Sequence, residues 1–230
     1  MNLRNILTCL VPLALFAHCQ PPAAPLRPDD SEFFPLETGR YVLYDVTEQR
    51  YSLTGPPVSQ TYQVKEVVGA AYRDVTGQPA FRLQRFRRTD DRSAWQPDSV
   101  WAIRRTDSRG IRTENGVDYV SLVFPADDRS RWNGNGLNSR GEDTYELRNS
   151  RRPFRVLDTL FDETVTVVQQ TDSTLVAQDK RIDVFARRVG LVYREKVWLQ
   201  YCTSSPGCVG RATIDFGYRQ IYRARTYGND

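Results

Sequence analysis

The chain has 230 residues, 40% of them hydrophobic and 11% aromatic, which is enough to bury a core as one domain. Its 32 basic and 28 acidic residues are interspersed along the chain, which disfavours nucleic acid as the partner. The single histidine, His18, lies in the leader described next, so His-dependent catalytic pairs and imidazole metal sites are excluded from the mature chain.

Residues 1–18 have the pattern of a signal peptide. Arg4 supplies a positive charge, and an uninterrupted run of mostly apolar residues extends from Ile6 to Ala17. This run is shorter than the roughly 20 residues that a membrane-spanning helix needs, so a removed export signal is predicted.

A cysteine closes the leader. The segment from Leu15 to Cys19 resembles the lipobox of bacterial lipoproteins, with His18 standing where Gly, Ala or Ser is usual. The resemblance implies that Cys19 becomes the lipid-modified first residue of a membrane-anchored protein. The alternative is an ordinary secretory signal cleaved near Ala17 or Ala24, which would leave Cys19 incidental.

Residues 19–32 are predicted to be the lipidated cysteine and a proline-rich tether. Proline recurs four times in this segment and favours an extended polyproline conformation, which could hold a domain up to about 40 Å from a membrane. By resemblance to the lipoproteins of enteric bacteria, Gln20 after the cysteine favours the outer membrane over retention in the inner membrane.

Residues 33–230 are predicted to form one all-β domain. Short apolar or alternating runs bounded by turn signals predict ten or so antiparallel strands, and no convincing amphipathic helix is present. The expected strands lie at about residues 41–46, 60–68, 78–88, 99–105, 117–124, 144–147, 154–157, 164–169, 174–177, 191–201 and 211–226, with a further short strand between the turn signals at 107–110 and 115–116. This pattern favours a single strongly curved antiparallel sheet, a half-barrel or a barrel, with a long C-terminal hairpin.

The run over residues 211–226 has the clearest strand pattern of the chain. Its even positions are mostly apolar or aromatic and its odd positions mostly polar, the period of an antiparallel strand with one wet face. A straight strand of this length would be too long for a compact domain, so a bend is expected at Gly217.

Two stretches resemble a group of predicted lipoproteins from Bacteroidota of unknown function. The first is Phe33-Phe34-Pro35-Leu36 followed by Gly39 and the Tyr-x-x-Tyr pattern of Tyr41 and Tyr44, soon after the lipobox. The second is the closing segment 184–195, Val-Phe-Ala-Arg-Arg-Val-Gly-Leu-Val-Tyr-Arg-Glu, together with residues 214–217. The resemblance implies a lipoprotein and carries no activity.

Two features of the middle strands have both a functional and a structural interpretation. The four arginines within residues 82–88 could form an anion site, but such a run is more often the solvated face of a strand. A switch of alternation there predicts a bulge near Gln84. Trp95 and Trp101 are expected to pack in the core or at an edge, with an aromatic sugar platform as the alternative.

The loop over residues 126–143 is the best place to expect a binding site. It is polar and glycine-rich, and long loops in compact domains are either functional or mobile. Trp132 is therefore the candidate ligand contact. Four acidic residues of this loop could supply oxygen ligands to calcium, but their spacing is not that of an EF-hand and solvated turns are expected. The preceding run 117–124 is apolar on both faces, which predicts a central strand.

Cys202 and Cys208 flank a Pro-Gly turn and are predicted to form a disulfide, as expected in an exported protein. No metal site and no cofactor are predicted. Asp162 and Glu163 are the adjacent acidic pair beside an apolar run, which leaves glycosidase chemistry formally open although a turn is favoured.

The sequence favours a non-enzymatic lipoprotein anchored in the outer membrane, whose β domain binds an envelope component or acts as an interaction module. A second hypothesis is a carrier that holds a lipid or another hydrophobic ligand in its curved sheet. A third is a carboxylate-dependent hydrolase of envelope glycans. The expected partners are thus the membrane, through the lipid anchor, and an envelope protein, lipid or glycan.

Overall fold

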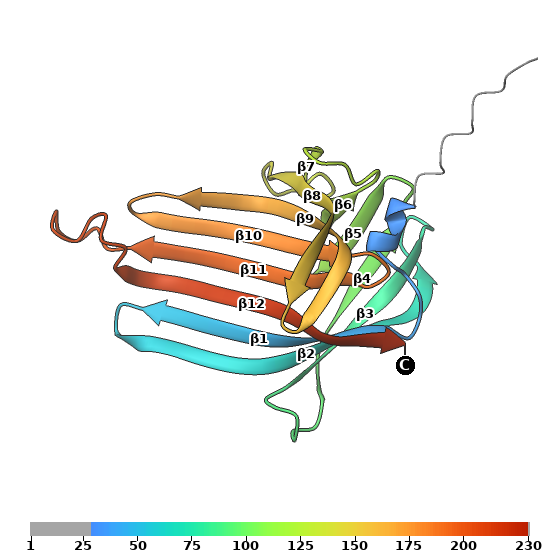
Figure 1. Cartoon of the computed structure of the whole chain (residues 1–230), viewed down its shortest axis with the longest axis horizontal. Helices are drawn as coiled ribbons and strands as arrows, with labels where there is room; N and C mark the ends of the chain where they lie inside the picture. Colours follow the sequence, from blue (N-terminus) through green and yellow to red (C-terminus); the bar gives the residue numbers. More distant parts are fainter. Residues whose placement is uncertain (1–28, 230) are drawn as a thin grey trace, which may run out of the picture.

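A computed structural model describes residues 29–229, which form a single antiparallel sheet (Figure 1). The leader, Cys19 and most of the expected tether lie outside the described residues. The elements are the 3-10 helix η1 (Asp30–Phe33) and the strands β1 (Arg40–Ser52), β2 (Gly55–Arg73), β3 (Pro79–Arg88), β4 (Gln96–Arg105), β5 (Arg109–Glu114), β6 (Val117–Val123), β7 (Arg131–Asn133), β8 (Thr144–Val156), β9 (Thr159–Ser173), β10 (Ala177–Ala186), β11 (Gly190–Tyr201) and β12 (Ile214–Asn229).

The sheet has twelve strands and nearly closes into a barrel. Its order is β6-β5-β4-β3-β2-β1-β12-β11-β10-β9-β8-β7, so β6 and β7 are the two ends of the hydrogen-bonded ladder. These ends meet, because the Val120 N–H donates to the Gly134 carbonyl at 2.9 Å and Trp132 Nε1 donates to the Val120 carbonyl at 2.8 Å. The predicted all-β fold with a strongly curved sheet is therefore confirmed, and so is the long C-terminal hairpin of β11 and β12.

One end of the barrel is plugged by the segment that enters the fold. Phe33 and Phe34 are buried in the first hydrophobic cluster, with interior residues of β3, β6, β8 and β9. The carboxylate of Asp30, also buried, accepts hydrogen bonds from the Ala126 N–H at 2.8 Å and from Arg151 Nη2 at 2.7 Å. The start of the described chain is thus fixed to this end of the barrel.

The other end of the barrel is open. In Figure 1 the far halves of β9 to β12, β1 and β2 extend leftward beyond the shorter strands, while η1 lies at the right. The hairpin of β8 and β9 folds over the outside of the long strands, where its Phe154 and Phe161 rings lie 5.6 and 5.7 Å from the rings of Tyr193 and Tyr227. Phe154, Phe161 and Tyr193 belong to a second hydrophobic cluster, which also includes residues of the inner face such as Tyr44 and Tyr222.

Several strand boundaries differ from the sequence prediction. Residues 211–213 belong to the turn before β12, where the Cys202 N–H donates to the Thr213 carbonyl at 2.8 Å. Residues 174–176 form the β9–β10 turn, closed by Thr174 N–H to the Ala177 carbonyl at 2.8 Å, so the strand expected at 174–177 was wrong. The irregularity expected near Gln84 lies between Arg85 and Phe86 in the pairing with β4.

The expectation of a central strand at 117–124 was also wrong. β6 is the last strand of the ladder, and its apolar character reflects a different environment. One side of its backbone is covered across the seam by residues 132–138, since Trp132 binds the Val120 carbonyl and Asn138 Nδ2 donates to the Asp118 carbonyl at 2.7 Å. A terminal strand at the seam of a nearly closed barrel is buried almost as a central strand is.

Residues 29–229 include no helix with the length and apolarity that a bilayer crossing requires.

Candidate functional site: a charged network and a polar cavity inside the barrel

The inner face of the C-terminal hairpin carries the residues of the site. Arg194, Lys196 and Trp198 of β11 lie directly opposite Tyr222, Gln220 and Tyr218 of β12. Directly opposed residues of an antiparallel pair point to the same side of the sheet. Since Arg194 contacts Glu114 of β5 across the barrel, that side is the interior.

A network of ion pairs crosses the middle of the barrel. Asp183 is bound by Arg194 at 2.8 and 2.7 Å, and Arg194 Nη1 lies 3.0 Å from Glu114 Oε1. Arg112 Nε continues the network at 3.1 Å from Glu114 Oε1, and Arg112 Nη2 lies 3.1 Å from Glu66 Oε1. The network therefore links β10 and β11 to β5 and β2 on the opposite wall.

Arg85 of β3 extends the network further. Its Nε donates to Glu66 Oε1 at 3.1 Å, and its guanidinium lies 3.9 Å from the centre of the Trp101 ring. Its Nη2 also reaches the Tyr222 hydroxyl at 3.4 Å. Arg85 therefore lies inside the barrel, and the solvated-face interpretation of the arginine run was wrong for this residue.

Two carboxyl groups of the network, those of Glu114 and Glu66, have lowered pKa values. Burial by itself opposes the charge of Glu114, but Arg194, Arg112 and Lys196 hold the pKa of that carboxyl well below its usual range. Burial likewise opposes ionisation of Glu66, and Arg112 and Arg85 nevertheless lower its pKa. Paired charges of this kind fill the barrel centre with fixed polar groups instead of an apolar lumen.

A polar cavity of about 220 Å³ lies beside the network, toward the open end. Its walls come from both ends of the ladder and from the long hairpin. The lining residues are Glu114, Tyr119, Ser121, Asn135, Arg140, Asp143, Tyr145, Gln169, Arg181, Arg194, Lys196 and Tyr218. The cavity is thus assembled from residues that are distant in the sequence.

The cations of the cavity differ in how fully they are paired. Arg181 forms a bidentate ion pair with Asp143, at 2.7 and 3.2 Å. Arg194 forms ion pairs with Asp183 and Glu114. The nearest carboxylate oxygen to Lys196 Nζ is that of Glu114 at 4.0 Å, beyond hydrogen-bonding distance. Burial, together with the charge of Arg194, lowers the pKa of Lys196. Lys196 is therefore an incompletely paired cation at the cavity wall.

Arg140 is the second incompletely paired cation. It is exposed, and its guanidinium lies 5.7 Å from the centre of the Tyr119 ring. Within residues 29–229 that guanidinium makes no hydrogen bond or ion pair to a protein group. The cavity therefore presents two cations without an anion in hydrogen-bonding distance: Arg140, which forms no ion pair within residues 29–229, and Lys196, whose nearest carboxylate neighbour is Glu114 at 4.0 Å.

Three aromatic rings form a platform beyond the cavity, on the same inner face. Trp198, Phe216 and Tyr218 have ring centres 5.7 Å (Trp198–Phe216) and 6.4 Å (Trp198–Tyr218) apart. Trp198 is 40% exposed and Phe216 39% exposed, while Tyr218 also lines the cavity. We call these three residues the aromatic platform.

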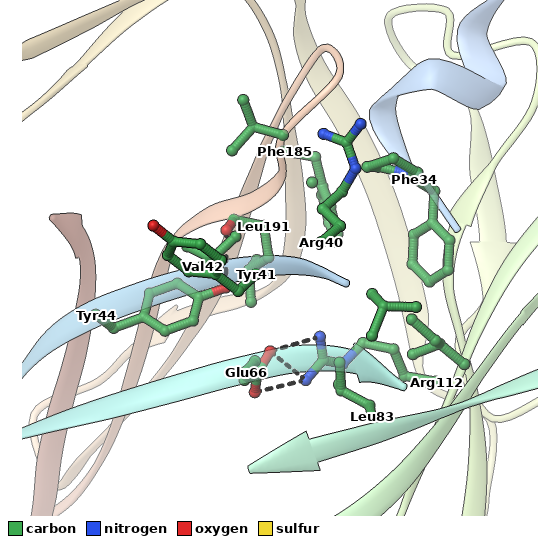
Figure 2. A pocket seen from close by; sticks show the side chains of 15 residues that line it. Phe34, Arg40, Tyr41, Val42, Tyr44, Glu66, Leu83, Arg112, Phe185 and Leu191 are labelled. Carbon is green, nitrogen blue, oxygen red and sulfur yellow. Dashed lines mark hydrogen bonds and ion pairs between the residues drawn. The ribbon is translucent and has the colours of Figure 1, made fainter. Parts of the chain in front are cut away.

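A smaller pocket lies between the network and the plug, and it is shown in Figure 2. It holds about 50 Å³ and is lined mainly by apolar side chains, among them Phe34, Tyr44 and Leu191, with the Glu66–Arg112 ion pair on one side. Pockets that bury a drug-sized ligand usually hold about 300–1,000 Å³, and a lipid needs at least as much. This pocket is a packing gap of the core.

One solved structure resembles the fold. It is the crystal structure of a protein from Parabacteroides distasonis described as a candidate lipoprotein, with 10% sequence identity over 85% of this chain and 98% of that chain and a TM-score of 0.39. No protein-family model matches the chain. No curated protein sequence matches it.

The disulfide predicted from the sequence is confirmed. Cys202 and Cys208 are joined across the turn between β11 and β12, with their Cα atoms 5.7 Å apart. The disulfide lies at the open end of the barrel in the same hairpin as the aromatic platform.

Trp132, the candidate ligand contact, lies at the barrel seam. It is half-buried, its indole N–H donates to Val120, and its ring packs edge-on against Tyr145 at 5.9 Å. The structure thus gives Trp132 a place in the packing of the seam, while Asn135 and Arg140 of the same loop line the cavity. Ligand contact by Trp132 stays a prediction.

Four other candidates from the sequence contact neighbouring protein groups. Trp95 and Trp101 stack against Arg88 and Arg85, which agrees with the packing interpretation. Asp143 pairs with Arg181, and Asp128 accepts from the Ser150 N–H at 2.7 Å. Residues 29–229 contain no cluster of three acidic, cysteine or histidine side chains arranged for a metal ion.

Sequence reasoning missed Glu114, Arg194, Lys196 and Trp198. Each stands at a polar or mixed position of an alternating strand, and such positions are usually solvated. The signal that was available is the density of opposite charges over residues 112–114 and 194–196 in two strands that both have apolar neighbours.

Proposed function

We propose that this chain is a non-enzymatic lipoprotein anchored in the outer membrane, whose barrel binds a polar component of the cell envelope. The observation that carries the binding function is the 220 Å³ polar cavity with its incompletely paired Lys196 and Arg140. The anchor is supported by the leader, Cys19 and the proline-rich tether of the sequence.

The position of the entering segment supports an orientation for this protein. The tether leads to η1 at the plugged end, whereas Lys196 and Trp198 lie in the second half of β11, the strand that runs toward the opposite end (Figure 1). A lipid at Cys19 would therefore hold the plug toward the membrane and leave the binding end accessible.

The arrangement favours binding over hydrolysis of a glycan. Glycosidases need one carboxyl whose pKa is raised so that it carries a proton at neutral pH. In this cavity the cationic neighbours lower the pKa of Glu114, and Asp143 forms an ion pair with Arg181. The interior is filled by ion pairs, and its apolar pocket of about 50 Å³ is too small for the lipid-carrier alternative.

The anchor is tested with two cysteine variants of the full chain. Cys19→Ser should abolish incorporation of an alkyne-labelled fatty acid and release the protein from the membrane fraction. Cys9→Ser, inside the apolar run of the leader, is the matched control and should keep both the label and the membrane association. Labelling that survives Cys19→Ser would contradict the anchor.

The binding function is tested by native mass spectrometry. The full chain is purified gently, in a mild detergent, from the envelope of its own organism, and its intact mass is compared with that of the same protein after denaturation and refolding. We expect a stoichiometric adduct that refolding removes. A bare domain in repeated preparations, with no adduct at any ionic strength, would overturn ligand binding.

A further inference from the structure

We propose that the ligand of this cavity is a carboxylate-bearing saccharide, whose ring stacks on the aromatic platform and whose carboxylate is bound by Lys196 and Arg140. The inference rests on the proposed binding function and names its ligand class. Three independent observations carry it: the two cations of the cavity, the cavity hydroxyl groups that bind no protein group within residues 29–229, and the exposed rings of the aromatic platform.

The charge of the cavity selects an anion of low charge. Lys196 and Arg140 lack an anionic partner within hydrogen-bonding distance. A bound carboxylate would accept a charge-assisted hydrogen bond from each of them. Glu114 and Asp143 also line the cavity and would repel a dianionic phosphate more strongly than a single carboxylate. A carboxylate therefore fits the balance of charges better than a phosphate ester does.

The neutral lining suits the hydroxyl groups of a sugar. The hydroxyls of Tyr119, Ser121 and Tyr218 line the cavity, and in residues 29–229 none of them makes a hydrogen bond to another protein group. A hydroxyl both donates and accepts, so each can pair with a sugar hydroxyl in either direction. Gln169 adds an amide, whose Nε2 donates to Asp183 at 3.1 Å and thereby orients the side chain.

The aromatic platform lies close enough to Lys196 for one sugar ring to contact both. Trp198 and Lys196 are two residues apart on β11 and share one face, which places their Cα atoms about 6.6–6.8 Å apart. A sugar ring that lies against the exposed Trp198 can thus direct a carboxylate substituent toward Lys196. Tyr218 belongs to both the platform and the cavity and connects the two.

The test combines binding measurements with matched variants. Immobilised glycans carrying glucuronate, galacturonate, N-acetylneuraminate or muramate are compared with the methyl esters of the same sugars, which keep the ring and lose the charge. We expect binding to at least one free acid, with its methyl ester bound about 10- to 100-fold more weakly because a charge-assisted hydrogen bond is lost.

Five variants assign the residues. Lys196→Met should weaken binding by about 10- to 100-fold, while Lys196→Arg should retain most of it. Lys180→Met is the control, because Lys180 lies on β10, the strand next to β11, and pairs with Glu195 at 2.8 Å. Trp198→Ala should weaken binding by about 3- to 10-fold, and Trp95→Ala should leave it unchanged.

A second readout does not depend on the stability of the variants. Lys196 has a lowered pKa, so an amine-acylating reagent should modify it in the free protein, and the bound acidic sugar should protect it. Protection of Lys196 without protection of Lys180 supports the inference. Equal binding of free acids and methyl esters, or binding that survives Lys196→Met, overturns it.

The outcomes separate this inference from the function on which it rests. A neutral glycan or a lipid found as the native adduct would overturn the acidic-sugar assignment and leave the binding function standing. Absence of any native adduct together with absence of glycan binding would overturn both.

Discussion

Glu114 and Arg194 are 80 residues apart in the chain, yet Oε1 of Glu114 lies 3.0 Å from Nη1 of Arg194 inside the barrel. The contact joins β5, near one end of the ladder, to β11 on the opposite wall. Because Arg194 also holds Asp183 and Glu114 also holds Arg112, the pair connects the two halves of the charged network.

Removing Glu114 should therefore be strongly destabilising. Glu114→Ala leaves Arg112, Arg194 and Lys196 without their shared anion, and breaking a buried pair in this way typically costs about 3–5 kcal/mol. The measurement is the free energy of unfolding in urea. Glu37→Ala is the control, because its pair with Arg40 is exposed and is worth about 0–1 kcal/mol. Equal losses in the two variants would contradict a structural role for the network.

The same carboxylates predict a loss of stability in acid. The folded state lowers the pKa of Glu66 and of Glu114 below the value of 4.5 for an unperturbed glutamate. Their contribution to stability is thus complete above about pH 4.5 and is lost as the pH falls through the folded pKa values. Urea unfolding from pH 7 to pH 3 should show this decline, and Glu114→Gln should make it shallower. A slope unchanged by Glu114→Gln would remove that carboxylate as a cause.

The sequence predicted the local structure better than the pairing of distant strands. Alternation over residues 211–226 identified β12, and turn signals placed most hairpins, because both depend on neighbouring residues. The closure of the sheet depends on the contact of Trp132 with Val120 and could not be read from either segment alone. For the same reason the apolar strand β6 was expected in the centre.

The site was missed because the rule for solvated faces fails inside this barrel. Val197 and Leu199 are buried, and they alternate along β11 with Lys196 and Trp198. In an ordinary antiparallel sheet this alternation would place Lys196 and Trp198 on the face exposed to solvent. Here the polar face lines the interior, since charges from opposite walls neutralise one another. Which charges meet is a property of the ladder order, and a single sequence does not contain it.

The plug at the start of the domain predicts where the chain can be shortened. A protein that begins at Asp29 should unfold at the same temperature as the longer chain. One that begins at Arg40 loses Phe33 and Phe34, each worth about 1.5–3 kcal/mol of burial, as well as the contacts of Asp30. Thermal unfolding followed by circular dichroism measures the difference. A protein beginning at Arg40 that keeps its Tm would show that the plug is dispensable.

Gly217 should be intolerant of any side chain. Its φ is +131°, and a Cβ atom there would lie 2.1 Å from the Trp198 carbonyl oxygen, so the neighbouring strand would have to move. Gly217→Ala should lower the free energy of unfolding by about 2–4 kcal/mol. Gly55→Ala is the control, because a Cβ atom there meets open space, and its effect should stay within about 0.5 kcal/mol. A small effect at Gly217 would mean that β11 and β12 separate easily at this point.

The disulfide between Cys202 and Cys208 should stabilise the domain by restricting a short loop of the unfolded chain. The double change Cys202→Ser with Cys208→Ser should lower the free energy of unfolding by about 2 kcal/mol under oxidising conditions. In the presence of a phosphine reductant the original protein should fall to the stability of the variant, because both chains then lack the cross-link. Urea unfolding with and without the reductant measures both effects. Cys202 is only 9% exposed, so a difference that persisted in the reductant would have to come from packing of the serine side chain. Such a result would assign the role of this pair to the core of the hairpin rather than to the cross-link.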